Sequence, residues 1–326
     1  MSLILADGVG RHRVTRRRTS TKHLLSAEAL TPDCVDEICE LADNFEAGFA
    51  KANHPDGTAI ALLFFQPSTR TRLGFEVATV ALGCHAVGQA DMTASRSNAR
   101  SGETLEDCGA VISNLCDAIV LRHHDVGAAA RIASRSSIPV INAGDGWNEH
   151  PTQALIDLHA IRRSLGSIKG RSIAFGGDPR GRTVRSLMYL MRYELPAEIV
   201  FCPPAHSPVP EDILNILRMS QIRYRVVGDI TEALRQCDAI MMAPYDMSDI
   251  GETASSDYIS PRVSPDSHII NAEKIHETAS QSLIFHPLPR QDEINVDCDD
   301  LPNARYFEQV RLSKYIRMAV LNRALS

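Results

Sequence analysis

Short aliphatic runs that alternate with longer segments of helical period are the feature that most constrains the fold of this 326-residue chain. Such alternation is typical of α/β domains built on parallel sheets, whose buried strands are apolar along their whole length. A helix is expected directly after Thr31, an N-cap residue that precedes Pro32 at the first helical position. The apolar runs predict strands at 59–65, 85–90, 118–122, 139–143, 172–176, 198–202, 223–227, 239–243 and 282–286.

Four of the expected strands precede His150 and five follow it, so we predict two doubly wound parallel-sheet domains joined by interdomain helices. The first domain is expected to cover residues 22–150 and to be completed by a C-terminal helix at 306–326. The second is expected to cover 151–305. Residues 1–21 are rich in arginine and are expected to form a flexible basic arm.

Composition excludes several classes of protein. The formal net charge of −6 argues against a nucleic-acid binder, which would normally carry a basic face. No apolar run approaches the ~20 residues that span a bilayer, so no membrane insertion is expected. The eight cysteines form no C-x-x-C pair, which argues against a zinc site or a disulfide framework and favours a reducing, cytoplasmic setting. We expect neither a metal nor a cofactor.

Hydroxyls and arginines cluster where the first apolar run ends and a helix begins. Ser68, Thr69 and Thr71 alternate there with Arg70 and Arg72. A helix N-terminus offers unpaired N–H groups and the positive end of the helix dipole, and a guanidinium adds a planar fork suited to phosphate. Ser68 could instead only cap the helix, with both arginines solvated, but the density of donors favours a phosphate site.

Arg122 closes another apolar run, at a strand end of the kind where open α/β sheets bind their ligands. His123 and His124 follow it directly. A histidine pair of this kind is more often a loop than a metal site, and no third ligand stands at metal spacing. We therefore assign no metal to this pair.

Further polar side chains follow later strands. His150 and Gln153 begin a helix and, three residues apart, point to similar sides. Arg182 also stands at a helix start, where it would suit a carboxylate. The preceding loop resembles a dinucleotide fingerprint only loosely, because Asp178 occupies the place of the second glycine. In His286-Pro287-Leu288-Pro289-Arg290, two prolines hold the backbone and leave the Leu288 carbonyl free to accept a hydrogen bond.

Taken in order, these segments resemble the aspartate and ornithine carbamoyltransferases, and the aspartate branch more closely. Pro287 favours that branch, since the ornithine branch would be expected to carry cysteine there. The resemblance extends from about Lys22 to the C-terminus. It is carried by the motifs Ser68-Thr69-Arg70-Thr71-Arg72, Ser101-Gly102-Glu103-Thr104, Arg122-His123, His150-Pro151-Thr152-Gln153, Gly181-Arg182-Thr183 and His286-Pro287-Leu288-Pro289-Arg290.

The resemblance implies a carbamoyl-phosphate domain followed by an amino-acid domain, with the active site between them and shared with a neighbouring subunit of a homotrimer. Arg122 and His150 would polarise the carbamoyl carbonyl together with Thr71. Gln153 and the Leu288 carbonyl would orient the carbamoyl nitrogen. The residues implied to hold the phosphate are Ser68, Thr69, Arg70, Thr71 and Arg122, and those implied to bind the acceptor are Arg182, Asp246, Pro287 and Leu288.

Two departures from the family pattern bear on activity. Ser101 stands where the family has a lysine contributed by the neighbouring subunit, and the sequence has no lysine between Lys51 and Lys169. Ser97 of the same loop matches, and Arg100 could supply a substitute cation. After the strand at 239–243, Pro244-Tyr245-Asp246 replaces the family's Arg-x-Gln, which contacts the side-chain carboxylate of aspartate.

These departures predict a carbamoyltransferase that transfers the carbamoyl group from carbamoyl phosphate to an amino-acid acceptor other than aspartate, because Asp246 would repel a second carboxylate. One alternative is an ordinary aspartate carbamoyltransferase of pyrimidine biosynthesis. Another is a catalytically silent paralogue that acts as a structural or regulatory subunit.

Overall fold

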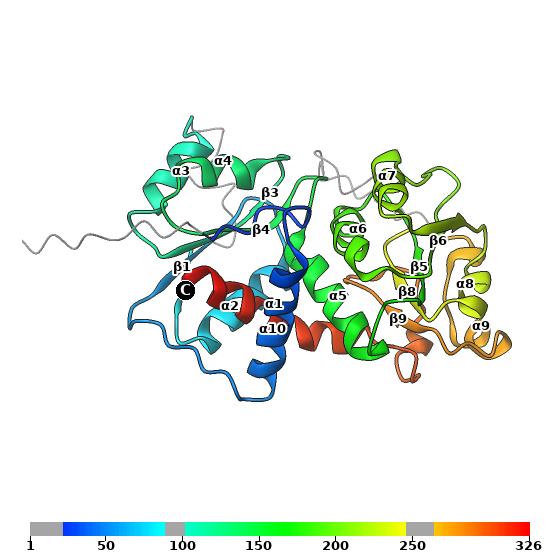
Figure 1. Ribbon diagram of the computed structural model, residues 1–326. Coiled ribbons are helices and arrows are strands. Elements are labelled where there is room, and N and C mark those ends of the chain that lie inside the picture. Colours follow the sequence, from blue (N-terminus) through cyan, green and yellow to red (C-terminus); the bar gives the residue numbers. More distant parts are fainter. Residues whose placement is uncertain (1–21, 89–101, 246–263) are drawn as a thin grey trace, which may run out of the picture.

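The computed structural model describes residues 22–88, 102–245 and 264–326 and places two parallel sheets in separate lobes (Figure 1). The first sheet has the order β2-β1-β3-β4 and the second the order β7-β6-β5-β8-β9. The expected α/β class with two doubly wound parallel sheets is thereby confirmed. The strands are β1 (Ala59–Phe64), β2 (His85–Val87), β3 (Ala118–His123), β4 (Val140–Asp145), β5 (Ser172–Gly176), β6 (Glu198–Cys202), β7 (Arg223–Val226), β8 (Ala239–Met242) and β9 (Leu283–Phe285).

Helices connect the strands within each lobe, as parallel pairing requires. The first begins as the sequence predicts, because Pro32 is its first residue and the Thr31 side chain accepts a hydrogen bond from the Cys34 N–H. The helices are α1 (Pro32–Glu46), α2 (Thr69–Ala81), α3 (Leu105–Ile112), α4 (Ala128–Arg135), α5 (Pro151–Leu165), α6 (Arg182–Glu194), α7 (Glu211–Met219), α8 (Ile230–Gln236), α9 (Ala272–Glu277) and α10 (Tyr306–Leu325).

Each sheet has one point at which the order of its strands reverses. In the first sheet the chain leaves β1 toward β2 on one side and then returns to β3 on the other. In the second sheet the corresponding point lies between β5 and β8. Ligands of open α/β sheets bind in the crevice outside the carboxyl ends of the strands at such points. The fold therefore directs attention to the loops that follow β1, β3, β5 and β8.

Two helices tie the lobes together. In Figure 1, α5 lies between the two sheets, and its residues from Pro151 to Ile161 are almost all buried. One hydrophobic cluster runs from Ile60 in the first sheet through Ile156 of α5 to Ile173 in the second. The last helix, α10, packs against α1, α2 and α5. The two lobes are therefore joined by shared hydrophobic packing.

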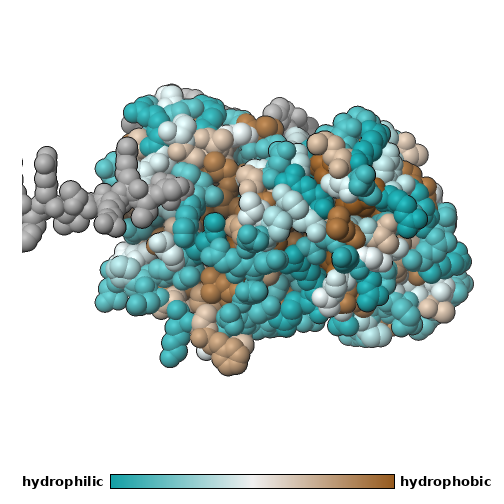
Figure 2. Space-filling view, in the orientation of Figure 1, coloured by the Kyte–Doolittle hydropathy of each residue, from teal (hydrophilic) through white to brown (hydrophobic). Residues whose placement is uncertain are grey.

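Hydrophilic residues cover most of the face in Figure 2, with smaller apolar patches between them. None of the helices in the described part of the chain is long and apolar enough to cross a membrane. The basic arm expected at residues 1–21 lies outside the described residues.

Candidate active site

The N-terminus of α2 opens toward solvent directly after β1. Ser68 occupies the N-cap position, but its side chain makes no capping hydrogen bond, so the alternative in which Ser68 only caps the helix finds no support. Thr71 is buried, whereas Thr69 and Arg70 are exposed. The N–H groups of a first helical turn have no partners inside the helix. This end of α2 thus combines backbone donors, hydroxyls and one guanidinium on a single surface.

Arg122 reaches the same region from the carboxyl end of β3, which pairs directly with β1. Its Nη1 donates to the Ala143 carbonyl at 3.1 Å, while its buried Nε has no partner among the described residues. Burial, together with the nearby guanidiniums of Arg182 and Arg70, holds the pKa of Arg122 well below its usual value. A buried cation beside two like charges is unfavourable unless an anion joins them.

Arg182, the first residue of α6, contributes a guanidinium from the second lobe to this cluster. Its Nη1 donates to the Gly146 carbonyl at 2.7 Å and to Gln66 Oε1 at 3.2 Å, both in the first lobe. Gly144, with φ of +115°, clears the space, because a Cβ there would lie 2.8 Å from Arg122 Nη1 and 3.2 Å from Arg182 Cζ. Burial lowers the pKa of Arg182 to about 10. Cations from both lobes therefore meet over one glycine.

His150 lies beside these arginines at the N-cap position of α5 and is only 4% exposed. Its backbone N–H donates to Ser186 Oγ at 2.8 Å, and its Nδ1 lies 3.3 Å from Thr152 Oγ1. Burial and the charges of Arg122, Arg182 and Arg317 hold the pKa of His150 well below its usual value. The imidazole is therefore neutral at physiological pH and suited to hydrogen bonding with a polarised carbonyl oxygen.

A pocket of about 210 Å³ adjoins the cluster. Its lining includes Arg70, Gln153 and Pro287, so it brings together three of the expected site residues. Leu288, next in the chain, has φ of 57° and donates its N–H to His286 Nδ1 at 2.7 Å. The other two arginines of the cluster and His150 do not line this pocket. Arg70 thus stands between the arginine cluster on one side and the pocket on the other.

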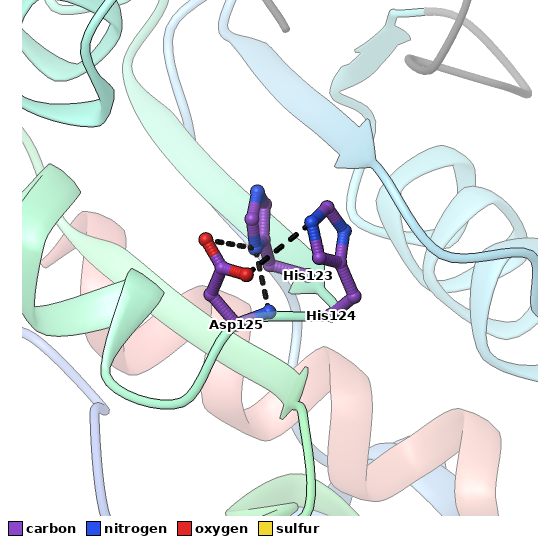
Figure 3. Close-up of side chains that lie close together, drawn as sticks. All are labelled: His123, His124 and Asp125. Atoms are coloured by element: carbon purple, nitrogen blue, oxygen red, sulfur yellow. Dashed lines mark hydrogen bonds and ion pairs between the residues drawn. The ribbon is translucent and has the colours of Figure 1, made fainter. Parts of the chain in front are cut away.

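The histidines after Arg122 form a compact turn with Asp125 (Figure 3). Their possible ligand atoms all lie within 4.8 Å of one another. However, His123 Nδ1 accepts the Asp125 backbone N–H at 2.9 Å, and the rings of His123 and His124 stack with centroids 4.2 Å apart. Burial lowers the pKa of His123 to about 4. Hydrogen bonding and stacking account for the arrangement, and a metal would have to displace the N–H from Nδ1.

Some expected site residues are not among those that the structure describes. Ser97, Arg100, Ser101 and Asp246 lie outside the described ranges, so their predicted contacts stay predictions. Asp178, which argued against a dinucleotide site, is wholly buried and accepts a hydrogen bond from Ser207 Oγ at 2.7 Å.

Sequence reasoning did not assign three polar residues at the pocket to the site: Asp157, Gln309 and Arg317. Asp157 of α5 accepts hydrogen bonds from Gln153 and from Gln309 of α10. Arg317 also lines the pocket, is 4% exposed and passes so close to Gly74 that a Cβ there would lie 2.5 Å from its Nη1. The i,i+4 spacing of Gln153 and Asp157 was a usable signal. The approach of Arg317 to Gly74 had none.

Two family models match adjoining parts of the chain. The aspartate/ornithine carbamoyltransferase carbamoyl-P binding domain matches residues 22–163, and the Asp/Orn binding domain matches residues 169–323. The chain belongs to the aspartate/ornithine carbamoyltransferase family. It is accordingly a carbamoyltransferase. The expected division of this carbamoyltransferase at residue 150, with α10 counted in the first domain, stays a prediction.

Similar proteins place the carbamoyltransferase near the aspartate branch. The chloroplastic aspartate carbamoyltransferase of Oryza sativa subsp. japonica is 37% identical, over 91% of this chain and 83% of the rice protein. The aspartate carbamoyltransferase catalytic subunit from Methanocaldococcus jannaschii is 35% identical. The match to its solved structure covers 93% of this chain and 97% of the archaeal chain, with a TM-score of 0.81. A Trypanosoma cruzi aspartate transcarbamoylase in complex with N-(phosphonacetyl)-L-aspartic acid gives 0.80 at 29% identity, covering 93% of this chain and 95% of its own.

These relatives correct the expected acceptor. Proteins 35–37% identical over most of the chain are named aspartate carbamoyltransferase, so the expectation of an acceptor other than aspartate is wrong. That expectation gave the substitution in one loop, around Asp246, more weight than the remaining residues of the site. The described part of the site keeps its cations at Arg70, Arg122 and Arg182, and this concentration of positive charge suits anionic substrates.

Proposed function

We propose that this carbamoyltransferase transfers the carbamoyl group of carbamoyl phosphate to the amino group of aspartate, a reaction of pyrimidine biosynthesis. The observation that carries the proposal is the convergence of Arg122 and Arg182 beside the neutral imidazole of His150, with Arg70 close to Arg122. Within the described residues none of the three cations forms an ion pair with a carboxylate, so together they suit two anionic substrates. The named relatives supply aspartate as the acceptor.

The proposed roles are those that the family resemblance implies, and the geometry supports them. The phosphate would lie at the N-terminus of α2, against Ser68, Thr69 and the guanidiniums of Arg70 and Arg122. Thr71, Arg122 and the neutral His150 would donate to the carbonyl oxygen and stabilise the negative charge that develops on it. Since the ring of His150 is uncharged, it would act as a hydrogen-bond donor rather than as an acid that loses a full proton.

The acceptor would approach from the second lobe. Arg182 would take one carboxylate of aspartate beside the Arg122 guanidinium, and Pro287 and Leu288 would border the amine. The neutral amine attacks the carbonyl carbon, a tetrahedral intermediate forms, and the C–O bond to phosphate breaks. The departing phosphate can accept the amine proton, so no strong protein base is needed.

We further propose a homotrimer in which the loop with Ser97, Arg100 and Ser101 reaches the site of a neighbouring subunit. Light scattering on the purified protein would test the assembly. A monomer that turns over at the full rate would contradict the shared site. The expected cytoplasmic location stays a prediction, and the plant relatives are named chloroplastic.

The reaction is tested by incubating the purified protein with carbamoyl phosphate and either aspartate or ornithine, and measuring carbamoylated product. We expect product from aspartate, and a loss of about ten- to a hundredfold in kcat/KM for aspartate in Arg182→Gln. Arg171→Gln, which removes an exposed guanidinium paired with Asp238, serves as the control. Product from ornithine alone, or no product from any amino acid, would contradict the proposal.

A further inference from the structure

Asp157 is the centre of a buried hydrogen-bond network behind the pocket. It lies on α5, is 1% exposed, and its Oδ1 accepts a hydrogen bond from Gln153 Nε2 at 2.7 Å. The same oxygen accepts a second hydrogen bond from Gln309 Nε2 of α10 at 2.6 Å. Gln309 is 1% exposed, and its Oε1 accepts the backbone N–H of His286 at 3.0 Å.

The directions of these hydrogen bonds follow from a group that can only donate. The backbone N–H of His286 can only donate, so Gln309 must present its oxygen to it and its amino group to Asp157. Both hydrogen bonds fall on Oδ1 of Asp157, which can accept from two amino groups whether or not Oδ2 carries a proton, so Gln153 also turns its amino group toward Asp157. Burial raises the pKa of Asp157 to about 7, although the hydrogen bonds from both glutamines and the charge of Arg317 oppose this rise.

The oxygen of the Gln153 amide then faces away from Asp157 and is the acceptor that this side chain can offer to the pocket. Gln153 lines that pocket, and its Oε1 has no protein partner among the described residues. A carbonyl oxygen accepts from N–H and offers nothing to a methyl group. We propose that Asp157 is a positioning residue that holds the Gln153 carbonyl toward the pocket and so makes the site select a donor substrate that bears an amino group.

This inference rests on the proposed function, since it concerns the carbamoyl donor, but it does not depend on the acceptor. Carbamoyl phosphate and acetyl phosphate differ in that a methyl group replaces the amino group. A buried acceptor left without its N–H costs the analogue about tenfold or more in affinity. If Asp157 no longer held the amide, Gln153 could turn its amino group inward, and much of that difference would disappear.

The test compares the two donors in binding, without any acceptor. Isothermal titration calorimetry would give the dissociation constants of carbamoyl phosphate and acetyl phosphate for wild type, Asp157→Leu and Asp157→Asn. In Asp157→Leu we expect the ratio of the two constants to fall about tenfold, mainly through weaker binding of carbamoyl phosphate. In Asp157→Asn we expect the ratio to be kept, because Gln309 still donates and forces the oxygen of the introduced amide to face both glutamine side chains.

Controls separate positioning from stability. Asp117 accepts the Ala59 N–H at 2.9 Å at the amino ends of the strands, so Asp117→Asn should leave the ratio unchanged. Asp157→Ala replaces Asp157→Leu if the latter does not fold, as judged by urea unfolding. A residue with a purely structural role would weaken both donors equally.

The outcomes also separate this inference from the proposed function. An unchanged ratio in a folded Asp157→Leu or Asp157→Ala protein would overturn the inference alone. A wild-type protein that does not bind carbamoyl phosphate would overturn the inference together with the proposed function.

Discussion

Arg122→Gln is expected to stabilise the ligand-free protein while it weakens the binding of phosphate. The reason is that Arg122 carries a buried charge close to two other guanidiniums, with one nitrogen that has no partner among the described residues. In the absence of an anion this charge opposes folding. With an anion bound, the same charge is a main source of affinity, so one substitution should move the two quantities in opposite directions.

The structure sets the magnitude. Arg122 Nη1 lies 2.8 Å, and Arg182 Cζ 3.2 Å, from the position that a Cβ on Gly144 would occupy. The two atoms are therefore at most about 6 Å apart. Two unit charges at about 6 Å repel by about 3 kcal/mol at an effective dielectric constant of about 20. Loss of the bond to the Ala143 carbonyl offsets about 1 kcal/mol of this. We therefore expect the free energy of unfolding to rise by about 1–2 kcal/mol.

Urea unfolding at about 25 °C, with and without inorganic phosphate, measures both effects on the same protein. At about 100 times its dissociation constant a ligand stabilises wild type by about 2.7 kcal/mol. A ten- to hundredfold loss of affinity would remove about half or more of that gain in Arg122→Gln. Arg131→Gln, which breaks an exposed pair with Glu106, should change the free energy of unfolding by less than about 1 kcal/mol and leave the phosphate effect intact.

Two results would refute this reasoning. If ligand-free Arg122→Gln were less stable than wild type by more than the scatter of the control, the charge would not oppose folding. If phosphate stabilised the variant as much as wild type, Arg122 would not contact the anion.

Three further predictions concern buried groups. A glycine-to-alanine change normally favours a helix, but Gly74→Ala should destabilise the protein by about 1–3 kcal/mol, because the new Cβ would lie 2.5 Å from Arg317 Nη1. Urea unfolding measures this change, and a gain in stability would contradict the prediction. Burial raises the pKa of Asp157 to about 7 from 3.8, so the folded state keeps a proton that the unfolded state loses, and stability falls as pH rises through that window. Urea unfolding from about pH 4 to 8 should therefore show the free energy of unfolding of Asp157→Asn rising, relative to that of wild type, by up to about 4 kcal/mol. A difference between the two proteins that does not change with pH would contradict this prediction. The lowered pKa of His150 has the opposite effect on stability, because the unfolded state takes up the proton first as pH falls below 6.5. Wild type should therefore lose stability below that pH. His150→Asn should lose less over the same titration.

The sequence was sufficient to predict the strands and the edge of the sheets that holds the site. Buried parallel strands are apolar throughout, so runs such as that before Arg122 are visible without a structure. Polar residues that directly follow such runs must meet at one edge, and this places Arg70, Arg122 and Arg182 together. The helix start at Thr31 followed from capping chemistry alone.

Contacts between distant segments could not be predicted in the same way. Asp157 and Gln309 lie 152 residues apart in sequence, and no periodicity links α5 to α10. Gly74 and Gly144 look like ordinary glycines until the guanidiniums that pass over them are placed. The acceptor was misjudged because the substitution at Asp246 was treated as decisive, whereas Arg122 and Arg182 bring positive charge to the site from both lobes.

The last described helix has a consequence for how the protein is made. The apolar faces of α1, α2 and α5 are covered by α10, which is synthesised after every other described element. During translation these faces emerge early and stay uncovered until residues 306–325 follow. The first lobe therefore stays incomplete until residues 306–325 have been synthesised, and its exposed apolar faces are of the kind that chaperones shield. Pausing of the ribosome shortly before codon 306 should accordingly increase aggregation of the nascent chain.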